Sequence, residues 1–395
     1  MTFLKMHFFR IILLFLLVFF SCNTTTITSN EFTLNGFDGA VVPAPLSDEC
    51  LTQIDSTVSR YLSGFRFNGN VLVAYKGYPV AKYSYGYANY YTRERLNHHT
   101  LFQLASVSKA FTAMSVLMLY ERGQINIYQP VQQYIPEFPF PEITIKHLLQ
   151  HTSGLPNYMF YVDNYWQKDK PLHYNDVLNL LKVHGNALGF RPGRRFHYSN
   201  TGYAMLAMLV EKVSGIPYYR FVKENIFNPL GMDRSFVWNL NDADTVTNVA
   251  VGFSRRGRRL RIYNHDPLDE ISGDKSVFST TADMLKWEQA WHPGKLLSDS
   301  LIQLAFTKVV TPRQRVHDYG MGWRFTTENN RQVIYHNGLW NGFTSSMSRY
   351  IEDEITIILL NNMNAPVAGI VKNLYYKVSD VVNTCKDKEL LAANQ

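Results

Sequence analysis

The sequence predicts an α/β fold in which a single antiparallel sheet, built from both ends of the chain, is flanked by helices and carries an inserted, mainly helical subdomain. Near the N-terminus, the stretch "NVLVAYKGYPVAKYSYGYA" contains two β-rich runs around a Lys-Gly turn, which is typical of a hairpin. The middle of the chain has helical periodicity, and the last third returns to strand-like runs. Strands at both ends around a helical middle indicate one shared sheet, so we expect catalytic groups at the seam between sheet and helices.

The expected elements can be placed in chain order. A helix is expected in "LTQIDSTVSRYLSGF", before the hairpin. Further helices are expected over residues 109–122 and in "ITIKHLLQ", "YNDVLNLLKV", "TGYAMLAMLVEKVSG" and "YYRFVKENIF", most of which are followed by Gly or Pro. Strands are expected in "QVIYHNG", "TSSMSRYI" and "EITIILLNN", before a last helix over residues 367–382.

These patterns predict one domain at residues 49–385, with a helical insert over roughly residues 104–250 and a polar tail over residues 386–395. The chain has 395 residues, of which 46% are hydrophobic and 14% aromatic, and this composition suits a compact globular protein. The formal net charge is +7. Such a mild positive field does not indicate a nucleic-acid partner by itself.

The first 22 residues predict a targeting segment. "MTFLKMHFFR" supplies positive charge, and the apolar run "IILLFLLVFF" is too short to span a bilayer comfortably, which favours an export signal over a permanent helical anchor. The following "SC" completes a pattern that resembles a bacterial lipoprotein box, in which Cys22 would become the lipidated N-terminus. We therefore expect a protein of the bacterial cell envelope, anchored to a membrane by lipid and facing the periplasm or the exterior. Plain secretion is the alternative, because the "FF" before Ser21 departs from the usual pattern.

Residues 23–48 are poor in apolar side chains and predict a polar tether. Beyond Cys22, the chain holds Cys50 and Cys385, which flank the domain in two predicted terminal helices. In an oxidising compartment these two residues could form a disulfide bond. Two unrelated, semi-buried thiols are the other interpretation, because sequence does not give the geometry.

The first candidate for chemistry is Ser106, which lies one helical turn before Lys109 at the start of an apolar helix. Positions i and i+3 share a helix face, so the ammonium can reach the hydroxyl. A Ser hydroxyl is a weak nucleophile until a neighbour removes its proton, and a Lys whose pKa is lowered by burial and nearby positive charge can do so. The helix N-terminus also favours a developing anion. Ser108 is a rival nucleophile, but it has no comparable lysine.

A second candidate group lies in "FRPGRRFHYSNTGYAML", in a turn before a helix. Tyr198 could ionise near two ammonium groups and act as a general base. Asn200 can both donate and accept hydrogen bonds, which suits it to bridge Lys109 and a substrate amide. Taken alone, the tripeptide means little, because Tyr and Asn in a turn are usually structural.

The third candidate group is in "VIYHNGLWNGF", where a strand ends in His336, Asn337 and Gly338. The glycine would let a substrate backbone lie close against the strand edge. The amide of Leu339 could pair with the amide of Ser106 as an oxyanion hole. The other interpretation of His336 is a strand-end histidine with an ordinary hydrogen bond.

In this order, Ser-x-x-Lys, Tyr-x-Asn and a strand with His-x-Gly resemble the serine β-lactamase and penicillin-binding-protein superfamily. Other stretches resemble its class C β-lactamase-related branch, namely "ITIKHLLQHTSGLP", "IFNPLGM", "GDKSVFSTTADMLKW" and "YGMGW". The resemblance covers nearly the whole chain after the tether. It implies the β-lactamase/transpeptidase-like fold, acylation of Ser106, and proton transfers shared by Lys109 and Tyr198.

The third motif departs from the pattern of true class C β-lactamases, which carry Lys-Thr-Gly where this chain has His336, Asn337 and Gly338. Because His is mostly neutral at pH 7, losing a permanent cation argues against an efficient β-lactamase. Family members with His at this place resemble D-aminopeptidases, D,D-peptidases and esterases. We therefore predict a serine hydrolase that acts through an acyl-enzyme on a small molecule or peptide with a hydrolysable ester or amide carbonyl.

A penicillin-binding sensor, or a homologue that is acylated without turnover, is the alternative, because the placement of a deacylating water is invisible in sequence. The sequence has neither a His-Glu-x-x-His pattern nor a P-loop, so we expect no metal and no cofactor. The predicted site divides into catalytic residues (Ser106, Lys109 and Tyr198) and residues for substrate or oxyanion (Asn200, His336, Gly338 and Leu339).

Overall fold

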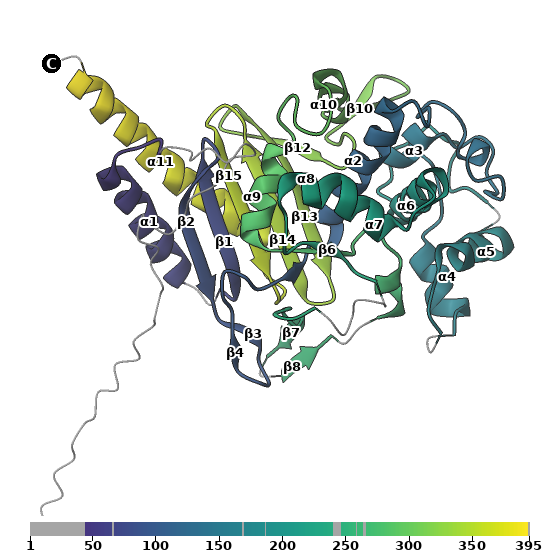
Figure 1. Ribbon diagram of the computed structural model, residues 1–395, viewed down its shortest axis with the longest axis horizontal. Coiled ribbons are helices and arrows are strands. Elements are labelled where there is room, and N and C mark those ends of the chain that lie inside the picture. Colours follow the sequence, from purple (N-terminus) through teal and green to yellow (C-terminus); the bar gives the residue numbers. More distant parts are fainter. Residues whose placement is uncertain are drawn as a thin grey trace, which may run out of the picture.

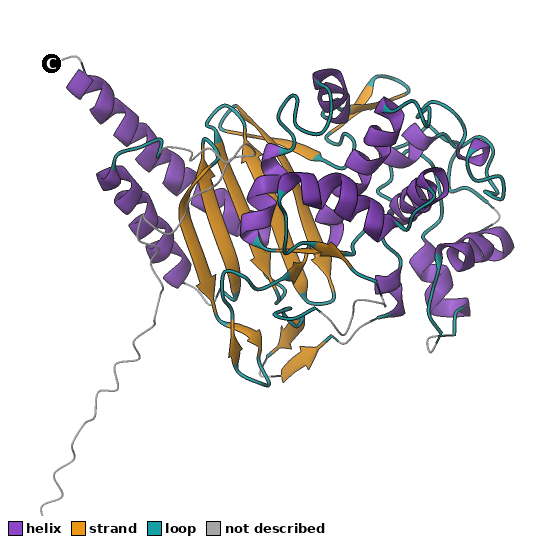
Figure 2. Ribbon diagram, in the orientation of Figure 1, coloured by secondary structure: helices purple, strands orange, loops and turns teal. Residues whose placement is uncertain are grey.

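A computed structural model of the chain describes residues 44–64, 67–167, 170–185, 187–239, 246–257, 259–263 and 266–393. The predicted export signal, most of the predicted tether and the lipidation site at Cys22 lie outside the described residues. Figures 1 and 2 show a central sheet with helices on both sides. Among the helices of the described ranges, none combines the length and the apolar character needed to cross a membrane.

The central sheet has six strands, in the order β12-β13-β14-β15-β1-β2, and every pairing in it is antiparallel. The strands are β1 (Gly69–Tyr75), β2 (Tyr78–Tyr85), β12 (Arg324–Glu328), β13 (Arg331–Trp340), β14 (Phe343–Tyr350) and β15 (Ile355–Asn361). Because β1 pairs with β15, strands from the two ends of the chain lie side by side. The predicted fold class is therefore confirmed.

Helices cover both faces of this sheet. One face carries the two terminal helices, α1 (Asp48–Ser63) and α11 (Val367–Ala393). The other carries the helical part of the chain: α2 (Ser108–Glu121), α3 (Ile145–Leu149), α4 (Tyr158–Tyr165), α5 (Tyr174–His184), α6 (Asn200–Ser214), α7 (Tyr218–Val222), α8 (Asn228–Leu230), α9 (Thr281–Gln289) and α10 (Asp299–Ala305). The sequence did not predict α4, α9 or α10, which are short and have weak apolar stripes.

Shorter elements complete the fold. A three-stranded sheet has the order β5 (Phe102–Gln103), β9 (Val277–Ser279) and β6 (Phe236–Val237). The small hairpins are β3 (Tyr87–Asn89) with β4 (Glu94–Arg95), β7 (Phe253–Arg256) with β8 (Arg259–Ile262), and β10 (Val309–Thr311) with β11 (Arg315–His317). The single-turn segments are η1 (Ala105–Val107), η2 (Val131–Gln133), η3 (Lys223–Phe227, π-helical) and η5 (Pro267–Glu270).

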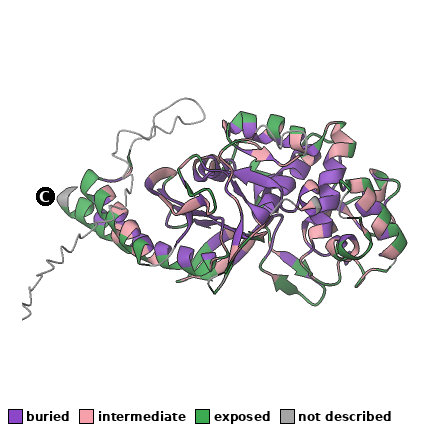
Figure 3. Cartoon of the chain, turned by 90° about the horizontal axis from the view of Figure 1, so that it is seen from below, coloured by how far each residue is buried: buried purple, intermediate pink, exposed green. Residues whose placement is uncertain are grey.

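Each face of the central sheet has its own hydrophobic core, because successive strand residues point to opposite faces. Leu72 and Ile358 belong to the larger core, together with α2, α6 and α9. Val71 and Ile357 belong to the second core, beneath α1 and α11. Figure 3 shows the buried strands and central helices inside the molecule and the exposed residues on the outer sides of the helices.

A disulfide bond joins Cys50 in α1 to Cys385 in α11, whose Cα atoms are 6.0 Å apart. Of the two interpretations of these cysteines, the disulfide is the one that the structure bears out. α11 begins at Val367 and continues to Ala393, so residues 386–393 are helical where we expected a polar tail. Beyond the disulfide, α11 still lies beside α1, where Lys388 Nζ is 3.3 Å from Glu49 Oε1.

Candidate active site

Ser106 lies in η1 directly before α2, and Lys109 lies in the first turn of that helix. The chain turns sharply at this point, because Ala105 has a φ of 48°, a left-handed conformation that strains a residue with a Cβ. Lys109 Nζ donates a hydrogen bond to Ser106 Oγ over 3.2 Å. The predicted contact between these two side chains is therefore present.

Lys109 is fully buried although its side chain ends in an ammonium group. Its second hydrogen bond goes to the backbone oxygen of Asp274, at 2.8 Å. Burial lowers the pKa of Lys109 to about 7; the Asp274 carboxylate opposes this shift, and the Arg324 guanidinium adds to it. A substantial share of Lys109 is therefore neutral at pH 7 and able to accept a proton.

Ser108, the rival nucleophile, has different surroundings. It is buried, and its Oγ accepts a hydrogen bond from the backbone N–H of Val277 at 3.0 Å. This contact fixes β9 beside the start of α2. A serine that holds a strand in place is a structural residue, so the geometry favours Ser106 as the nucleophile.

Gly338 allows the turn that carries Ser106 to pack directly on β13. A Cβ on Gly338 would lie 2.2 Å from the backbone oxygen of Leu104 and 3.0 Å from the Cβ of Ala105. The same oxygen of Leu104 accepts a hydrogen bond from Ser345 Oγ, at 2.6 Å, on the neighbouring strand. The structure thus adds a second reason for a glycine at this position, the packing of η1, while the approach of a substrate to the strand edge at Gly338 stays a prediction.

The last part of β13 has one open edge. β12 pairs with β13 only as far as Tyr335, which faces Arg324. From His336 onward, β13 pairs with β14 on one side, and the described residues include no partner strand on the other side. An open strand edge beside a nucleophile offers backbone groups to an extended substrate. Leu339 lies on this stretch, and the residue is 64% exposed.

Tyr198 and Asn200 lie at the start of α6, as predicted. Ser199 is the N-cap of this helix, and its side chain accepts a hydrogen bond from the backbone N–H of Gly202 at 3.2 Å. The Tyr198 hydroxyl is buried and forms no hydrogen bond of good geometry with the described residues. Burial raises the pKa of Tyr198, while Ser106 and Arg324 act in the opposite direction. The raised pKa favours the protonated hydroxyl at neutral pH, and the role of Tyr198 as a general base stays a prediction.

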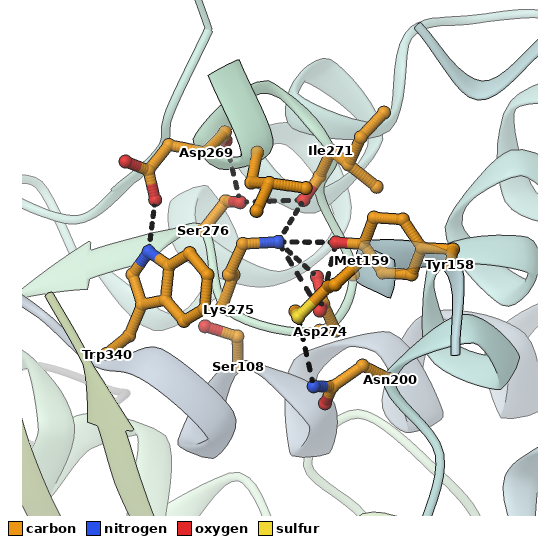
Figure 4. A network of polar contacts seen from close by, with 12 residues as sticks. Ser108, Tyr158, Met159, Asn200, Asp269, Ile271, Asp274, Lys275, Ser276 and Trp340 are labelled. Carbon is orange, nitrogen blue, oxygen red and sulfur yellow. Dashed lines mark hydrogen bonds and ion pairs between the residues drawn. The ribbon is translucent and has the colours of Figure 1, made fainter. Parts of the chain in front are cut away.

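The contacts of Asn200 differ from those expected for a bridge to Lys109, and its role toward a substrate amide stays a prediction. Its side-chain N–H donates to Met159 Sδ at 3.8 Å, and no hydrogen bond joins it to Lys109 in the described part of the chain. Its carbonyl oxygen is buried without a partner. Figure 4 shows Asn200 beside Met159, next to a buried polar network.

His151 positions the Tyr198 segment, a role that the sequence did not predict. Its Nδ1 accepts a hydrogen bond from the backbone N–H of Ser199 at 3.0 Å. Its ring lies 4.4 Å from the Tyr198 ring and 4.6 Å from the Tyr319 ring, between centroids. Burial lowers the pKa of His151 well below its usual range, so the ring is a neutral support. The signal in the sequence that could have pointed to His151 is the His-Thr-Ser-Gly segment, which belongs to the stretches that resemble the family.

Arg324 is a second residue of the site that the sequence did not predict. It directly follows "YGMGW", in which two glycines allow close packing: a Cβ on Gly322, whose φ is +80°, would lie 2.8 Å from Ala110 Cα in α2. This packing brings the Arg324 guanidinium carbon to 4.9 Å from the centre of the Tyr198 ring. The Lys109 ammonium lies 5.0 Å from the same ring centre, so two cationic side chains meet at Tyr198.

His336 is fully buried and does not carry the charge of a third-motif lysine. Its Nδ1 lies 2.8 Å from the backbone oxygen of Asn337, and its Nε2 lies 3.3 Å from the Tyr319 hydroxyl. Burial lowers the pKa of His336 well below its usual range, and the positive charges of Arg324 and Lys109 add to this effect. The ring is therefore neutral, and it supports the strand from inside.

A pocket of about 640 Å³ gathers part of the predicted site. Its lining includes four of the seven predicted residues, Ser106, Tyr198, Gly338 and Leu339, and adds Arg324. One wall is made by residues 364–369, at the start of α11. Lys109 lies beneath Ser106, while His336 is buried behind the strand edge. The arrangement is a serine with a buried, partly neutral lysine at the mouth of a pocket next to an open strand edge.

A buried ion pair supports this site from below (Figure 4). Lys275 Nζ lies 3.1 Å from Asp274 Oδ1 and donates to the Tyr158 hydroxyl at 2.6 Å. The backbone oxygen of the same Asp274 accepts a hydrogen bond from the Lys109 ammonium. The sequence does place an acidic and a basic residue next to each other in "GDKSVFS". It does not show that Lys275 also contacts Tyr158, because Tyr158 is more than 100 residues away.

Within the described residues, no cluster of three or more His, Cys, Asp or Glu side chains could hold a metal ion. Two histidines of the helical part have structural contacts instead. His147 takes part in a capping box with Thr144 at the start of α3, and His151 supports the Tyr198 segment.

The family model for β-lactamase matches residues 49–378, and the chain therefore belongs to that family. It is 34% identical over 308 residues to penicillin-binding protein 4* of Bacillus subtilis (strain 168), a match that covers 75% of this chain and 68% of the relative. It is 26% identical over 365 residues to protein flp of Staphylococcus aureus (strain MRSA252), covering 87% and 71%. These relatives support a serine hydrolase of the β-lactamase/transpeptidase type.

Solved structures agree on the fold. A penicillin-binding protein from Bacillus halodurans superposes with a TM-score of 0.69 at 26% identity, covering 83% of this chain and 99% of that one. A D-amino acid amidase from Ochrobactrum anthropi SV3 also has a TM-score of 0.69, at 22% identity, covering 87% of this chain and all of that one (100%). The likeness to the amidase concerns the fold alone.

Proposed function

We propose that the protein is an active serine hydrolase that forms an acyl-enzyme on Ser106 and cleaves an ester, peptide or amide bond. The observation that carries this proposal is the pairing of Ser106 Oγ with the Lys109 ammonium at 3.2 Å, together with the lowering of the pKa of Lys109 to about 7. A fully buried lysine without a carboxylate in direct contact lowers the stability of the fold. A role as general base would explain why the protein has such a residue.

In the acylation step, neutral Lys109 accepts the proton of Ser106 while the serine oxygen bonds to the substrate carbonyl carbon. The carbonyl oxygen becomes an oxyanion, which the amides of Ser106 and Leu339 would hold. The packing of η1 on β13 at Gly338 supports this pairing of amides. The tetrahedral intermediate then collapses, and the bond to the leaving nitrogen or oxygen breaks.

Tyr198 is suited to protonate that leaving atom, because its hydroxyl keeps its proton at neutral pH. It would regain a proton from the Lys109 ammonium, which lies 5.0 Å from the centre of the Tyr198 ring. In deacylation, a water molecule gives its proton to the same pair and its oxygen to the acyl carbon. Ser106 Oγ then leaves with a proton, and the free enzyme is restored.

An ester or D-amino-acid peptidase type of activity is favoured over efficient β-lactamase activity, because His336 is buried and neutral. The alternative is a penicillin-binding sensor that is acylated without turnover. Steady release of product distinguishes a hydrolase from a sensor, which would give a single stoichiometric burst.

The test is covalent labelling with a fluorophosphonate probe, followed by intact-protein mass spectrometry and peptide mapping. We expect one adduct on Ser106, its loss in Ser106→Ala, and its retention in the matched control Ser108→Ala. In Lys109→Ala, labelling should slow by about 10²–10⁴-fold because the general base is gone. A label that persists on the same peptide of Ser106→Ala would overturn the assignment of the nucleophile.

We also propose that the protein is exported and anchored to the cell envelope by lipid at Cys22. The disulfide between Cys50 and Cys385 supports an oxidising compartment. Metabolic labelling with a palmitate analogue, compared between the wild type and Cys22→Ala, tests the anchor. Equal labelling of both proteins would contradict it, and label-free protein in the medium would support plain secretion.

A further inference from the structure

We propose that a basic cleft next to the segment before α6 is a binding site for phosphate groups, and that its ligand is a phosphate monoester or a diphosphate. The cleft has a volume of about 760 Å³. Its lining combines four arginines with two rings, and these residues are Arg194, Arg195, Arg313, Arg315, Phe196 and His317. Among the described residues, the basic cleft and the pocket at Ser106 have no lining residue in common, so the inference does not depend on the acyl-enzyme function proposed above.

The four arginines come from two segments that are far apart in the sequence. Arg194 and Arg195 lie in the turn before α6. Arg313 and Arg315 lie at the tip of the hairpin of β10 and β11, which turns through two left-handed residues, Arg313 with a φ of 67° and Gln314 with a φ of 55°. The fold therefore brings two pairs of guanidinium groups to one cleft, one pair from each segment.

Contacts inside the protein hold both segments in place. The ring of Phe196 stacks on the ring of His317, with centroids 5.0 Å apart and an interplanar angle of 18°. His317 Nε2 lies 3.0 Å from Thr311 Oγ1 within the hairpin. On the other side, the backbone N–H of Gly193 donates to the backbone oxygen of Thr152 at 2.8 Å. Because the backbone on both sides is fixed, a ligand would have to order only the arginine side chains.

No acidic side chain is found among the described residues that line the basic cleft. The ion pairs in the described part of the chain include none of its four arginines. Asp318, which follows His317, already lies 2.6 Å from Lys308 Nζ through its Oδ1. A cleft with charges of one sign concentrates the electrostatic potential, and here it attracts anions.

The number of arginines indicates the class of anion. A guanidinium group binds two oxygens of a phosphate through parallel hydrogen bonds, and a phosphate monoester carries a charge of about −1.5 to −2 at pH 7. A single carboxylate has two oxygens and one charge, so it would leave most of the four guanidinium groups without a partner. A monoester or a diphosphate can contact arginines from both segments at once. Such a group can belong to a soluble phosphorylated molecule or to the headgroup of a lipid.

The test is calorimetry on the full chain with pyrophosphate and with tricarballylate, an anion that has three carboxylates. We expect pyrophosphate to bind more tightly by about tenfold or more. The double variant Arg194→Gln with Arg313→Gln removes one arginine from each segment and should weaken pyrophosphate binding by about 10- to 100-fold. The control is Arg255→Gln with Arg259→Gln, which removes the same charge from the hairpin of β7 and β8 and should keep the affinity.

Two outcomes of this experiment would overturn the inference. One is equal pyrophosphate affinity in the two double variants, which would mean that the charges act without a defined cleft. The other is tricarballylate binding as tight as that of pyrophosphate, which would exclude a preference for phosphate. Thermal melting of each variant establishes that it is folded, and all four substituted arginines are exposed.

The two sources of phosphate are distinguished by sn-glycerol 3-phosphate and dihexanoyl phosphatidic acid, used below its micelle concentration. Both carry the same phosphate monoester, and the second adds two short acyl chains. We expect both to displace pyrophosphate. Tighter binding of the lipid by about tenfold would assign the site to a lipid headgroup, and equal binding would assign it to a soluble phosphate ester. If neither displaced pyrophosphate, the proposed ligand class would be wrong.

His317 reports on the cleft in the wild-type protein. Burial lowers the pKa of His317; the Arg315 guanidinium adds to this effect, and the Asp318 carboxylate opposes it. A bound phosphate stabilises the imidazolium, so pyrophosphate should raise this pKa. Histidine-ring NMR between pH 5 and 8 measures the shift, and His317→Asn assigns the resonance. A pKa that pyrophosphate leaves unchanged would place any bound anion outside the basic cleft and contradict the proposal.

Discussion

Lys109 connects the burial of a single side chain to a pH dependence that can be measured. Burial lowers its pKa to about 7, and only the neutral amine can accept the proton of Ser106. Below this pKa, the neutral fraction falls tenfold per pH unit. We therefore expect the logarithm of the fluorophosphonate labelling rate to rise by one per pH unit up to about pH 7 and to level off above it. Labelling reactions quenched at fixed times between pH 5 and 9 measure this profile.

The charge of Arg324 should move this pH profile. Arg324 lowers the pKa of Lys109 because two positive charges repel, so its removal favours the protonated lysine. In Arg324→Gln, the rising limb of the profile should shift to higher pH, with the plateau reached later. Arg324→Lys is the matched control, since it keeps the charge and should leave the limb nearly in place. An unshifted limb in Arg324→Gln would mean that the guanidinium does not act on Lys109.

The buried pair of Asp274 and Lys275 gives a prediction on stability. Both side chains are at most 3% exposed, so removing one partner leaves an unpaired charge in the interior. We expect Lys275→Met to lower the free energy of unfolding by about 3–5 kcal/mol in denaturant titrations. The double variant Asp274→Asn with Lys275→Met should lose less than Lys275→Met alone, because no charge is left unpaired. The exposed pair of Arg220 and Glu224 is the control, and Arg220→Ala should change stability little.

At the scale of elements, the catalytic geometry depends on how closely η1 approaches β13. Gly338→Ala would place a Cβ 2.2 Å from the oxygen of Leu104, so the turn that carries Ser106 must move away. A displacement of about 1 Å can cost a hundredfold in rate, and we expect labelling to slow by about that factor while the protein remains folded.

Gly369 offers a matched control in the same pocket. A Cβ there meets nothing within 4 Å, and the residue lies in a helix, where alanine is favoured by about 0.5–1 kcal/mol. Gly369→Ala should therefore keep the labelling rate and raise the melting temperature slightly. Labelling of Gly338→Ala at the wild-type rate would show that η1 tolerates displacement from β13.

The elements that the sequence predicted are those whose signal is local. Hairpin β1–β2 follows from its Lys-Gly turn, and α6 follows from its N-cap Ser199 and the αL glycine Gly215 at its end. The pairing of Ser106 and Lys109 was predictable for the same reason, because they are three positions apart in one helical stretch of the chain, formed by η1 and the first turn of α2. Arg324 was not predictable, since its place beside Tyr198 depends on the packing of a glycine-rich turn against α2, which is a contact between distant segments.

At the scale of the whole molecule, the sheet separates two cores with different tasks. The core that includes α2 and α6 fixes the candidate site, and the core beneath α1 and α11 joins the two ends of the chain. The sequence predicted that both ends share a sheet, because strand patterns occur at both ends. It did not predict that β15 lies directly beside β1, because pairing and register are set by side-chain packing across the sheet.

This division predicts that the disulfide stabilises the fold without taking part in the chemistry. Cys50 and Cys385 close a span of 335 residues, and removing a native disulfide typically costs about 2–5 kcal/mol. α11 touches the pocket only in its first turn, and Cys385 lies 18 residues after Val367, about 27 Å along a straight helix.

We therefore expect the double variant Cys50→Ala with Cys385→Ala to unfold at lower denaturant concentration while keeping the wild-type labelling rate of Ser106 at 25 °C. Reduction of the wild type should destabilise it in the same direction, and the reductant should have no effect on the double variant. A labelling rate that falls together with the stability would mean that the second core transmits its packing through α11 to the pocket wall. The two faces of the sheet would then not be independent.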